Sequence, residues 1–411
     1  MAPARCSVRP TQPARVSAAA WRDRFEYKPR FSFYTIDSSV KTMPIIINAQ
    51  SIIEPIDIKV CHAKHFQFFK NGREAFVAGL IQRRVDKSCP VIFPSFYCVD
   101  VLQSVVNAGF KIIVSNINQK YEYDIVELES IVHNKKISAI VVVDFFGWKN
   151  NQINDILQKY GPKSILIIRD CCHSPFTWDG SKSAWEIAVF SWRKTIAVPD
   201  GGVLFNNEFE LSNTGLKNLN NNIFKYTVFY FKRRFKSLLL RTHRAVELLN
   251  KIQFKSNVYE VFLNGGVGKS ESPKSVKPSK YLLQALANNI EIEKIKLARR
   301  KNFEKICSGI QDLDILVPRF SFLSHNDFPY VVPLNVKDVV GTMRYLGENG
   351  IQSIIWPIVQ NYYSISSIAK KCCRATVPVT PLVCIPVNQE ITDVDLCKIV
   401  FIIRRRFEKI V

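Results

Sequence analysis

Short apolar runs alternate with amphipathic stretches between about residues 70 and 170 of this 411-residue chain. The clearest runs, 139–143 and 165–168, contain only alanine, valine, isoleucine and leucine, and they are too short for a buried helix. Apolar runs of this length with many β-branched residues are typical of buried parallel strands. Strands that alternate with helices predict an α/β fold, in which helices cover both faces of a parallel or mixed sheet.

The same pattern predicts an order of elements. Helices are expected at 71–84, 99–108, 125–132 and 152–160, and strands at 90–93, 111–114, 137–144 and 164–169. Residues 281–310 are expected to form one long helix. From about residue 317 a smaller α/β unit follows, with strands at 330–334 and 351–355 and helices at 336–349 and 393–408. A chain of this length is expected to hold two domains.

Composition divides the chain into four parts. Residues 1–42 begin with a stretch rich in arginine, alanine and proline, unlike the rest, and we treat them as an atypical N-terminal extension, either disordered or due to a misassigned start. Residues 43–212 form the predicted large domain, and 213–278 a basic helical insertion or connector. Residues 279–411 contain the long helix and the small C-terminal domain.

Positive charge is concentrated in one segment. The chain has 57 lysines and arginines against 35 acids, a net charge of +22. Residues 216–255 hold ten of the basic residues and a single acid, Glu247. Since no zinc-finger spacing, RNA-binding aromatic motif or basic-zipper heptad accompanies them, we do not expect nucleic acid as a partner. Residues 224–249 are partly amphipathic, which predicts either contact with an anionic membrane surface or a connecting helix packed on a dimer partner.

Hydropathy and cysteine usage indicate the compartment. The chain contains no run of 18 or more apolar residues, so no transmembrane helix is predicted. Its eleven cysteines include no CxxC motif, which argues against a disulfide framework and fits a reducing environment. We therefore expect a cytoplasmic protein without a metal site, peripheral at the membrane only if the basic segment binds lipid.

A carboxylate and a lysine follow two successive predicted strands. Asp170 ends the strand at 164–169, and Lys194 comes after the apolar run 187–192 and shortly before Gly201. Ligands of such sheets bind outside the carboxyl ends of the strands. Pyridoxal phosphate chemistry needs this pair, because the lysine holds the cofactor aldehyde as a Schiff base and the carboxylate keeps the pyridine nitrogen protonated.

Six segments in the same order resemble the DegT/DnrJ/StrS family of pyridoxal-phosphate-dependent sugar aminotransferases. They are 71–75, 93–98, 143–147, 170–174, 190–202 and 385–389. The resemblance covers roughly residues 45–411. It implies fold type I, similar to aspartate aminotransferase, with a mainly parallel sheet of the seven-stranded type in a large cofactor-binding domain and a smaller C-terminal α/β domain. It also implies a homodimer that moves an amino group from an amino acid, typically glutamate, to a keto group of a nucleotide-activated sugar in polysaccharide biosynthesis.

The resemblance assigns three residues to the reacting end of the cofactor. Lys194 would bond the aldehyde and then act as general base and acid. Asp170 would pair with the pyridinium nitrogen. His173 falls where the family carries a glutamine or histidine near the phenolic oxygen, which a donor there would stabilise.

Four further residues would hold the phosphate and the ring. Gly72 and Arg73 open the first helix, where backbone N–H groups favour an anion, although Arg73 replaces the hydroxyl residue of the family. Ser191 matches a phosphate-binding serine. Tyr97 is our candidate for the aromatic ring that covers the cofactor, because the aligned position holds Cys98.

Two alternatives stay open. The departures at Arg73 and Cys98 are compatible with a non-catalytic or regulatory member that binds the cofactor without turnover. Alternatively, residues 216–255 make the chain a membrane-surface protein. Some relatives carry histidine in place of the lysine and catalyse dehydration, and Lys194 argues against that reaction.

Overall fold

A computed structural model describes much of the chain. The described residues are 65–178, 180, 183–196, 198, 200–207, 217–218, 273, 276–277, 282, 289–356 and 380–408. All of them belong to one compact unit, Glu54–Val411. The predicted extension 1–42 lies outside the described residues, as does the basic segment except for β8 (Lys217–Asn218), β9 (Val276–Lys277) and Pro273.

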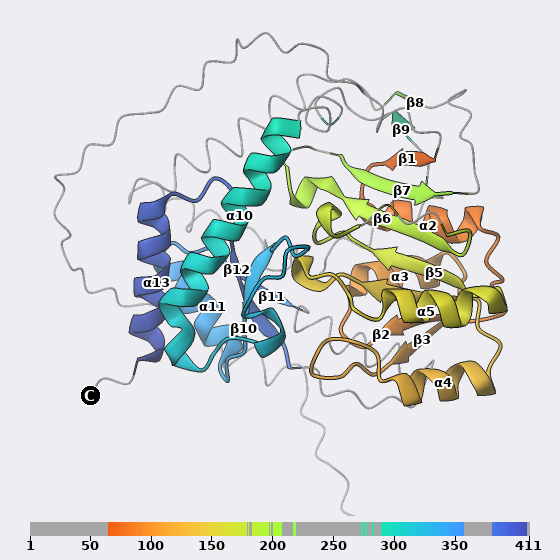
Figure 1. The fold of residues 1–411 in the computed structure, drawn as a ribbon, viewed down its shortest axis with the longest axis horizontal. Coiled ribbons are helices and arrows are strands. Elements are labelled where there is room, and N and C mark those ends of the chain that lie inside the picture. The colour runs from red at the N-terminus through yellow and green to blue at the C-terminus, as the bar shows by residue number, and fades with distance from the viewer. Residues whose placement is uncertain are drawn as a thin grey trace, which may run out of the picture. The chain divides into compact units, whose positions relative to one another are not determined.

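A seven-stranded sheet with the order β1-β7-β6-β5-β4-β2-β3 forms the larger part of this unit (Figure 1). The strands are β1 (Phe66–Phe69), β2 (Val91–Pro94), β3 (Ile112–Ser115), β4 (Ala139–Val143), β5 (Leu166–Asp170), β6 (Glu186–Ser191) and β7 (Gly202–Asn206). All neighbours pair in parallel except β7, which runs antiparallel to both β6 and β1. The predicted mainly parallel sheet is therefore confirmed. The edge strand β1 and the antiparallel β7 were not predicted.

Helices cover both faces of this sheet. They are α2 (Gly72–Gln82), α3 (Val99–Asn107), α4 (Ile125–Asn134) and α5 (Ile153–Tyr160), close to the four predicted helices. Alternate residues of β4 point to opposite faces: Val141 belongs to the core under α2 and α3, whereas Val142 belongs to the core under α4 and α5. Because both faces are covered, every residue of β4 is buried, which explains its continuous apolar sequence.

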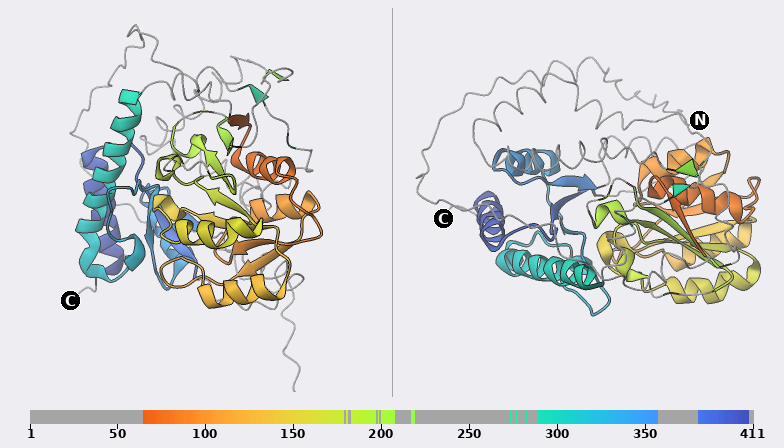
Figure 2. Two further views of the ribbon diagram at one scale, coloured as in Figure 1. Left: turned by 45° about the vertical axis from the view of Figure 1, so that its right-hand side comes forward. Right: turned by 90° about the horizontal axis from the view of Figure 1, so that it is seen from above.

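The C-terminal part is built around a three-stranded antiparallel sheet with the order β10-β12-β11 (Figure 2). Its elements are α10 (Asn289–Ile310), β10 (Val331–Leu334), α11 (Val339–Glu348), β11 (Ile354–Trp356), β12 (Leu382–Pro386) and α13 (Asp393–Phe407). The prediction of a smaller α/β unit is confirmed, although the central strand β12 was missed. Helix α13 begins where predicted because Thr392 and Asp395 form a capping box. Among the described residues, no helix is long and apolar enough to cross a membrane.

Candidate active site

The predicted site residues gather at the carboxyl edge of the large sheet. Strand β5 ends at Asp170, and β6 ends at Ser191 and continues into the 3₁₀ turn Trp192–Lys194. Since β5 and β6 are parallel neighbours, their ends lie at the same edge. Lys194 is close enough to His173 for its charge, second to burial, to lower the pKa of the imidazole.

Asp170 receives hydrogen bonds from two neutral donors. The Tyr97 hydroxyl donates to Oδ2 at 2.5 Å, and the Cys172 backbone N–H donates to Oδ1 at 2.9 Å. The aspartate is 7% exposed. Within the described part of the chain, no lysine, arginine or histidine forms an ion pair with it. The described residues thus leave this carboxylate without a cationic partner.

His173 is held as a neutral donor. Burial, then the Lys194 charge, lowers its pKa well below 6.5, so the imidazole is uncharged at neutral pH. The Phe146 backbone N–H donates to its Nδ1 at 2.9 Å, which requires an unprotonated Nδ1 and therefore a proton on Nε2. The ring lies between those of Phe146 and Tyr330, each 5.5 Å away, with Trp356 edge-on at 4.9 Å. His173 can accordingly offer an Nε2–H group to a ligand.

The loop after β4 has a strained backbone where the Phe146 N–H contacts His173. Phe146 has φ +56°, a left-handed conformation that costs free energy for a bulky residue. Its carbonyl accepts from Tyr330 N–H at 2.7 Å, and the Gly147 carbonyl accepts from Phe328 N–H at 2.8 Å. A Cβ on Gly147 would lie 2.0 Å from the Phe328 oxygen, so only glycine permits this approach. The segment before β10 therefore holds the loop that orients His173.

The N-terminus of α2 lies against the ends of β5 and β6. Asn71 caps the helix by accepting from Glu74 N–H at 3.1 Å. A Cβ on Gly72 would lie 2.9 Å from Cys172 Sγ and 3.4 Å from the Cβ of Ser191, so the first helical turn packs closely against the ends of β5 and β6. Helix N-termini attract anions through free N–H groups and the helix dipole. Gly72 and Ser191, predicted separately from the sequence, are neighbours there.

The other two predicted residues, Arg73 and Tyr97, make contacts within the protein that the sequence did not predict. Arg73 points its guanidinium at Asp100 of α3, with 3.8 Å between Nη1 and Oδ2, in a half-exposed ion pair. Tyr97 is 1% exposed, packs its ring on Phe93 with 5.2 Å between centroids, and donates its hydroxyl to Asp170. Stacking of Tyr97 on a cofactor ring, and phosphate binding by Arg73, stay predictions.

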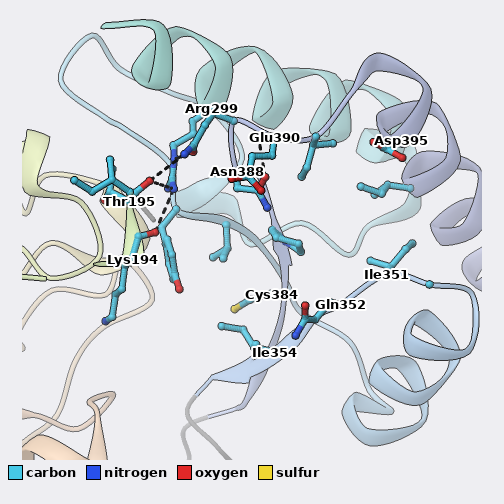
Figure 3. Close-up of a pocket in the computed structure, with 18 of the residues that line it drawn as sticks. Lys194, Thr195, Arg299, Ile351, Gln352, Ile354, Cys384, Asn388, Glu390 and Asp395 are labelled. Atoms are coloured by element: carbon cyan, nitrogen blue, oxygen red, sulfur yellow. Dashed lines mark hydrogen bonds between the residues drawn. The ribbon is translucent and has the colours of Figure 1, made fainter. Parts of the chain in front are cut away.

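Two residues without a role in the sequence prediction hold the turn that carries Lys194. Arg299 of α10 donates through Nη2 to the carbonyls of Lys194 and Thr195 at 3.2 and 3.1 Å. It also donates through Nε to Gln389 at 3.1 Å, and Gln389 donates to the Thr195 carbonyl at 3.2 Å. Burial lowers the pKa of Arg299 to about 10, so it remains charged at neutral pH. Figure 3 shows the Lys194 side chain running away from this contact.

A sequence signal for Arg299 existed. Helical spacing places it on the same stripe as Ile295, Phe303 and Ile306, all buried. An arginine on the buried stripe of a helix needs internal acceptors, which points to a specific polar contact.

A cavity of about 590 Å³ opens beside the same turn (Figure 3). Its wall combines the turn with the small sheet and the loop after α11, including Arg193, Arg299, Tyr330, Gln352, Asn388 and Lys398. Lys194 belongs to its lining, whereas Asp170, His173 and Gly72 do not. The cavity therefore lies next to the predicted site residues, between the Lys194 turn and the C-terminal part of the chain.

Residues 58–227 match the model of the DegT/DnrJ/EryC1/StrS aminotransferase family. No curated protein matches the sequence.

Solved structures share the fold at low sequence identity. The sugar aminotransferase CalS13 from Micromonospora echinospora is 16% identical, with 85% of this chain and 90% of that chain covered at a TM-score of 0.53. PseC of Helicobacter pylori, an aminotransferase involved in pseudoaminic acid biosynthesis, is 14% identical over 84% and 87%, with a TM-score of 0.55. Spr1654 of Streptococcus pneumoniae, solved in its PMP form, is 15% identical over 84% and 88%, with a TM-score of 0.52. The predicted fold class is confirmed by these likenesses.

Proposed function

Because the chain belongs to the DegT/DnrJ/EryC1/StrS aminotransferase family, which depends on pyridoxal phosphate, we propose that it transfers an amino group to a keto group of a nucleotide-activated sugar, with glutamate as donor. One observation carries the proposal. A lysine and a carboxylate leave neighbouring strands at one sheet edge, and the carboxylate has no protein cation among the described residues.

The donor groups fit pyridoxal phosphate. Among the described residues Asp170 has no positive partner, such as a pyridinium nitrogen would supply, and it accepts hydrogen bonds from the neutral Tyr97 hydroxyl and Cys172 N–H. At the other end, Gly72 opens α2 close to Ser191, and the N–H groups of a helix N-terminus suit a phosphate. The neutral His173 offers an N–H group to the phenolic oxygen. These contacts support Asp170, Gly72, Ser191 and His173 as cofactor ligands.

When bound, the cofactor supplies an electron-withdrawing ring that stabilises the carbanion formed on loss of a substrate proton. The residues of the chain do the rest. The Lys194 amine would condense with the cofactor aldehyde with loss of water and, when free, would take the proton from the amino-bearing carbon of the donor and deliver it to the aldehyde carbon of the cofactor. Arg299 and Gln389 fix the backbone from which Lys194 extends, so the amine returns to the same place after each half-reaction.

Charge and space support the substrate class. The cavity beside Lys194 is lined by Arg193, Arg299 and Lys398 as well as by the acids Glu390 and Asp395. Its volume of about 590 Å³ falls within the range of small-molecule sites. The solved relatives include a sugar aminotransferase and an enzyme of pseudoaminic acid biosynthesis. We propose a diphosphate-bearing sugar whose ring reaches Lys194 from this cavity, in a cytoplasmic homodimer.

Cofactor trapping tests the proposal. Purified full-length protein incubated with pyridoxal phosphate should turn yellow, and borohydride should fix the cofactor on the peptide that contains Lys194, as read by mass spectrometry. Lys194→Ala should abolish both the fixation and the formation of 2-oxoglutarate from glutamate with a panel of nucleotide-linked keto-sugars. Lys296→Ala is the matched control. Lys194 lies near two aromatic rings, and Lys296 likewise lies near those of Phe176 and Phe328.

The outcomes separate the alternatives. A protein that cannot be reconstituted with the cofactor contradicts the enzyme proposal. A cofactor bound at Lys194 without amino transfer from any donor favours the regulatory alternative. Contact with an anionic membrane depends on residues 216–255, almost all outside the described residues, and salt-sensitive flotation with anionic liposomes tests it separately.

A further inference from the structure

The Tyr97 hydroxyl is hydrogen-bonded to Asp170, the carboxylate on which the proposed cofactor site depends. We propose that Tyr97 controls, through Asp170, how firmly the ring nitrogen of bound pyridoxal phosphate keeps its proton. Tyr97 is thus a positioning residue that acts on the cofactor through another side chain. This inference rests on the proposed function and goes beyond it, because it assigns to Tyr97 a task other than covering the ring.

The direction of the hydrogen bond is fixed by burial. Tyr97 is 1% exposed, and burial first, then the charge of Asp170, raises the pKa of its phenol well above 10. The phenol therefore keeps its proton and donates it to Asp170 Oδ2 across 2.5 Å. This is the short distance of a charge-assisted O–H···O⁻ bond, about twice as strong as a neutral one.

The tyrosine cannot turn away from Asp170. Its ring packs on Phe93, which in turn stacks on Phe76 with 5.7 Å between centroids. These aromatic residues belong to β2 and α2, and both are at most 1% exposed. Since the phenol is almost completely shielded from bulk solvent, and Asp170 is its hydrogen-bond partner among the described residues, we treat this hydrogen bond as a fixed part of the site.

A carboxylate shares its charge among its donors. Oδ1 already accepts from the Cys172 N–H at 2.9 Å, so both oxygens of Asp170 hold a proton donor before any cofactor arrives. Each donor withdraws electron density and weakens the attraction left for a third, charged donor. Tyr97 should accordingly make the ring nitrogen lose its proton at lower pH than it would beside a carboxylate without a phenol.

The experiment measures the ring nitrogen directly. Full-length protein is loaded with pyridoxal phosphate labelled with ¹⁵N in the ring, and the ¹⁵N resonance is followed by NMR as a function of pH. Tyr97→Phe removes the donor without changing the shape of the ring. We expect the ring nitrogen to titrate about one pH unit higher in this variant, a tenfold tighter hold on the proton.

A second variant tests the opposite direction and does not depend on Tyr97→Phe folding well. Site-specific replacement of Tyr97 by 3-fluorotyrosine gives a stronger donor at the same position, and the ring nitrogen should then titrate at lower pH than in the wild type. Tyr123→Phe is the matched control, because Tyr123 is also buried and donates its hydroxyl to the neutral Val141 carbonyl at 2.7 Å. Its removal should leave the titration unchanged.

The route through Asp170 has its own test. If Tyr97 acts through the carboxylate, Tyr97→Phe should not change the ring-nitrogen resonance when Asp170→Asn is already present. Equal titration of the wild type and the Tyr97 variants, or an equal effect of Tyr97→Phe in both backgrounds, overturns the inference. The proposed function fails differently, through absence of a cofactor fixed on Lys194, so the two failures are distinguishable.

Discussion

Two neighbouring parallel strands end in aspartates whose surroundings differ. Asp144 follows β4, is fully buried, and lies 3.3 Å from the Nε of Arg169, itself 1% exposed. It also accepts from the Thr177 hydroxyl at 2.5 Å and the Asn150 N–H at 2.9 Å. Asp170, at the end of β5, accepts from neutral donors. An aspartate with a permanent cation ties loops together, whereas one without a cation is available to a charged ligand.

The largest expected effect is on folding, at Asp144. Asp144→Asn would remove the negative charge beside the buried Arg169 guanidinium and break their ion pair, and removing one member of a buried pair costs about 3–5 kcal/mol. Urea unfolding of the cofactor-free protein measures the free energy. The same substitution at Asp170 should cost less, about 1–2 kcal/mol, because the hydrogen bonds from Tyr97 and the Cys172 N–H lose their charge assistance but no buried cation loses an ion pair. Similar losses at both positions would show that the two carboxylates do not differ in their structural importance.

The reverse order is expected for catalysis. Asp170→Asn removes the negative charge that would face the ring nitrogen, and loss of one such electrostatic contact lowers kcat about 100- to 1,000-fold. Steady-state rates and cofactor dissociation constants measure the loss. They are determined under conditions in which the variant is folded. A variant with wild-type kcat would show that Asp170 is not the partner of the ring nitrogen.

The smallest expected effect is a pH dependence of stability at His173. Its pKa is lowered well below 6.5 by burial and Lys194, so below pH 6.5 the unfolded chain binds a proton that folded His173 does not. Stability due to His173 is therefore complete above pH 6.5 and falls as the pH is lowered, by at most about 1.4 kcal/mol per pH unit. The difference in unfolding free energy between wild type and His173→Asn, measured from pH 7.5 to 5.5, should show this slope. A constant difference would contradict a neutral buried imidazole.

Local patterns allowed much of the fold to be predicted. The strands β2 to β6 are covered on both faces, so their apolar runs were visible in the sequence. The missed edge strand β1 gave a weaker signal, because it is only half-buried over its first two residues. Strands β7 and β12 are buried apolar runs and were missed although their composition favours strands.

The site was predictable as a set of residue types and was not predictable as contacts. Asp170 and Lys194 could be named because each follows a predicted strand, whereas His173, Ser191 and Gly72 were assigned from the family resemblance. Arg299 and Gln389 were missed as holders of the turn, because Arg299 bonds a carbonyl 105 positions away.

By itself, the sequence determined the β/α order and the residue types at the strand ends, because helical and strand periodicities are local and parallel strands deliver their ends to one edge. Strand pattern alone could not separate Asp144 from Asp170, since both are aspartates after apolar strands, and it was the pairing with Lys194 and the family resemblance that singled out Asp170. Only the tertiary structure decided which partners each carboxylate has. It brought Arg169 to one carboxylate and Tyr97, 73 positions away, to the other, and the charge of the partner determines what a buried carboxylate can do.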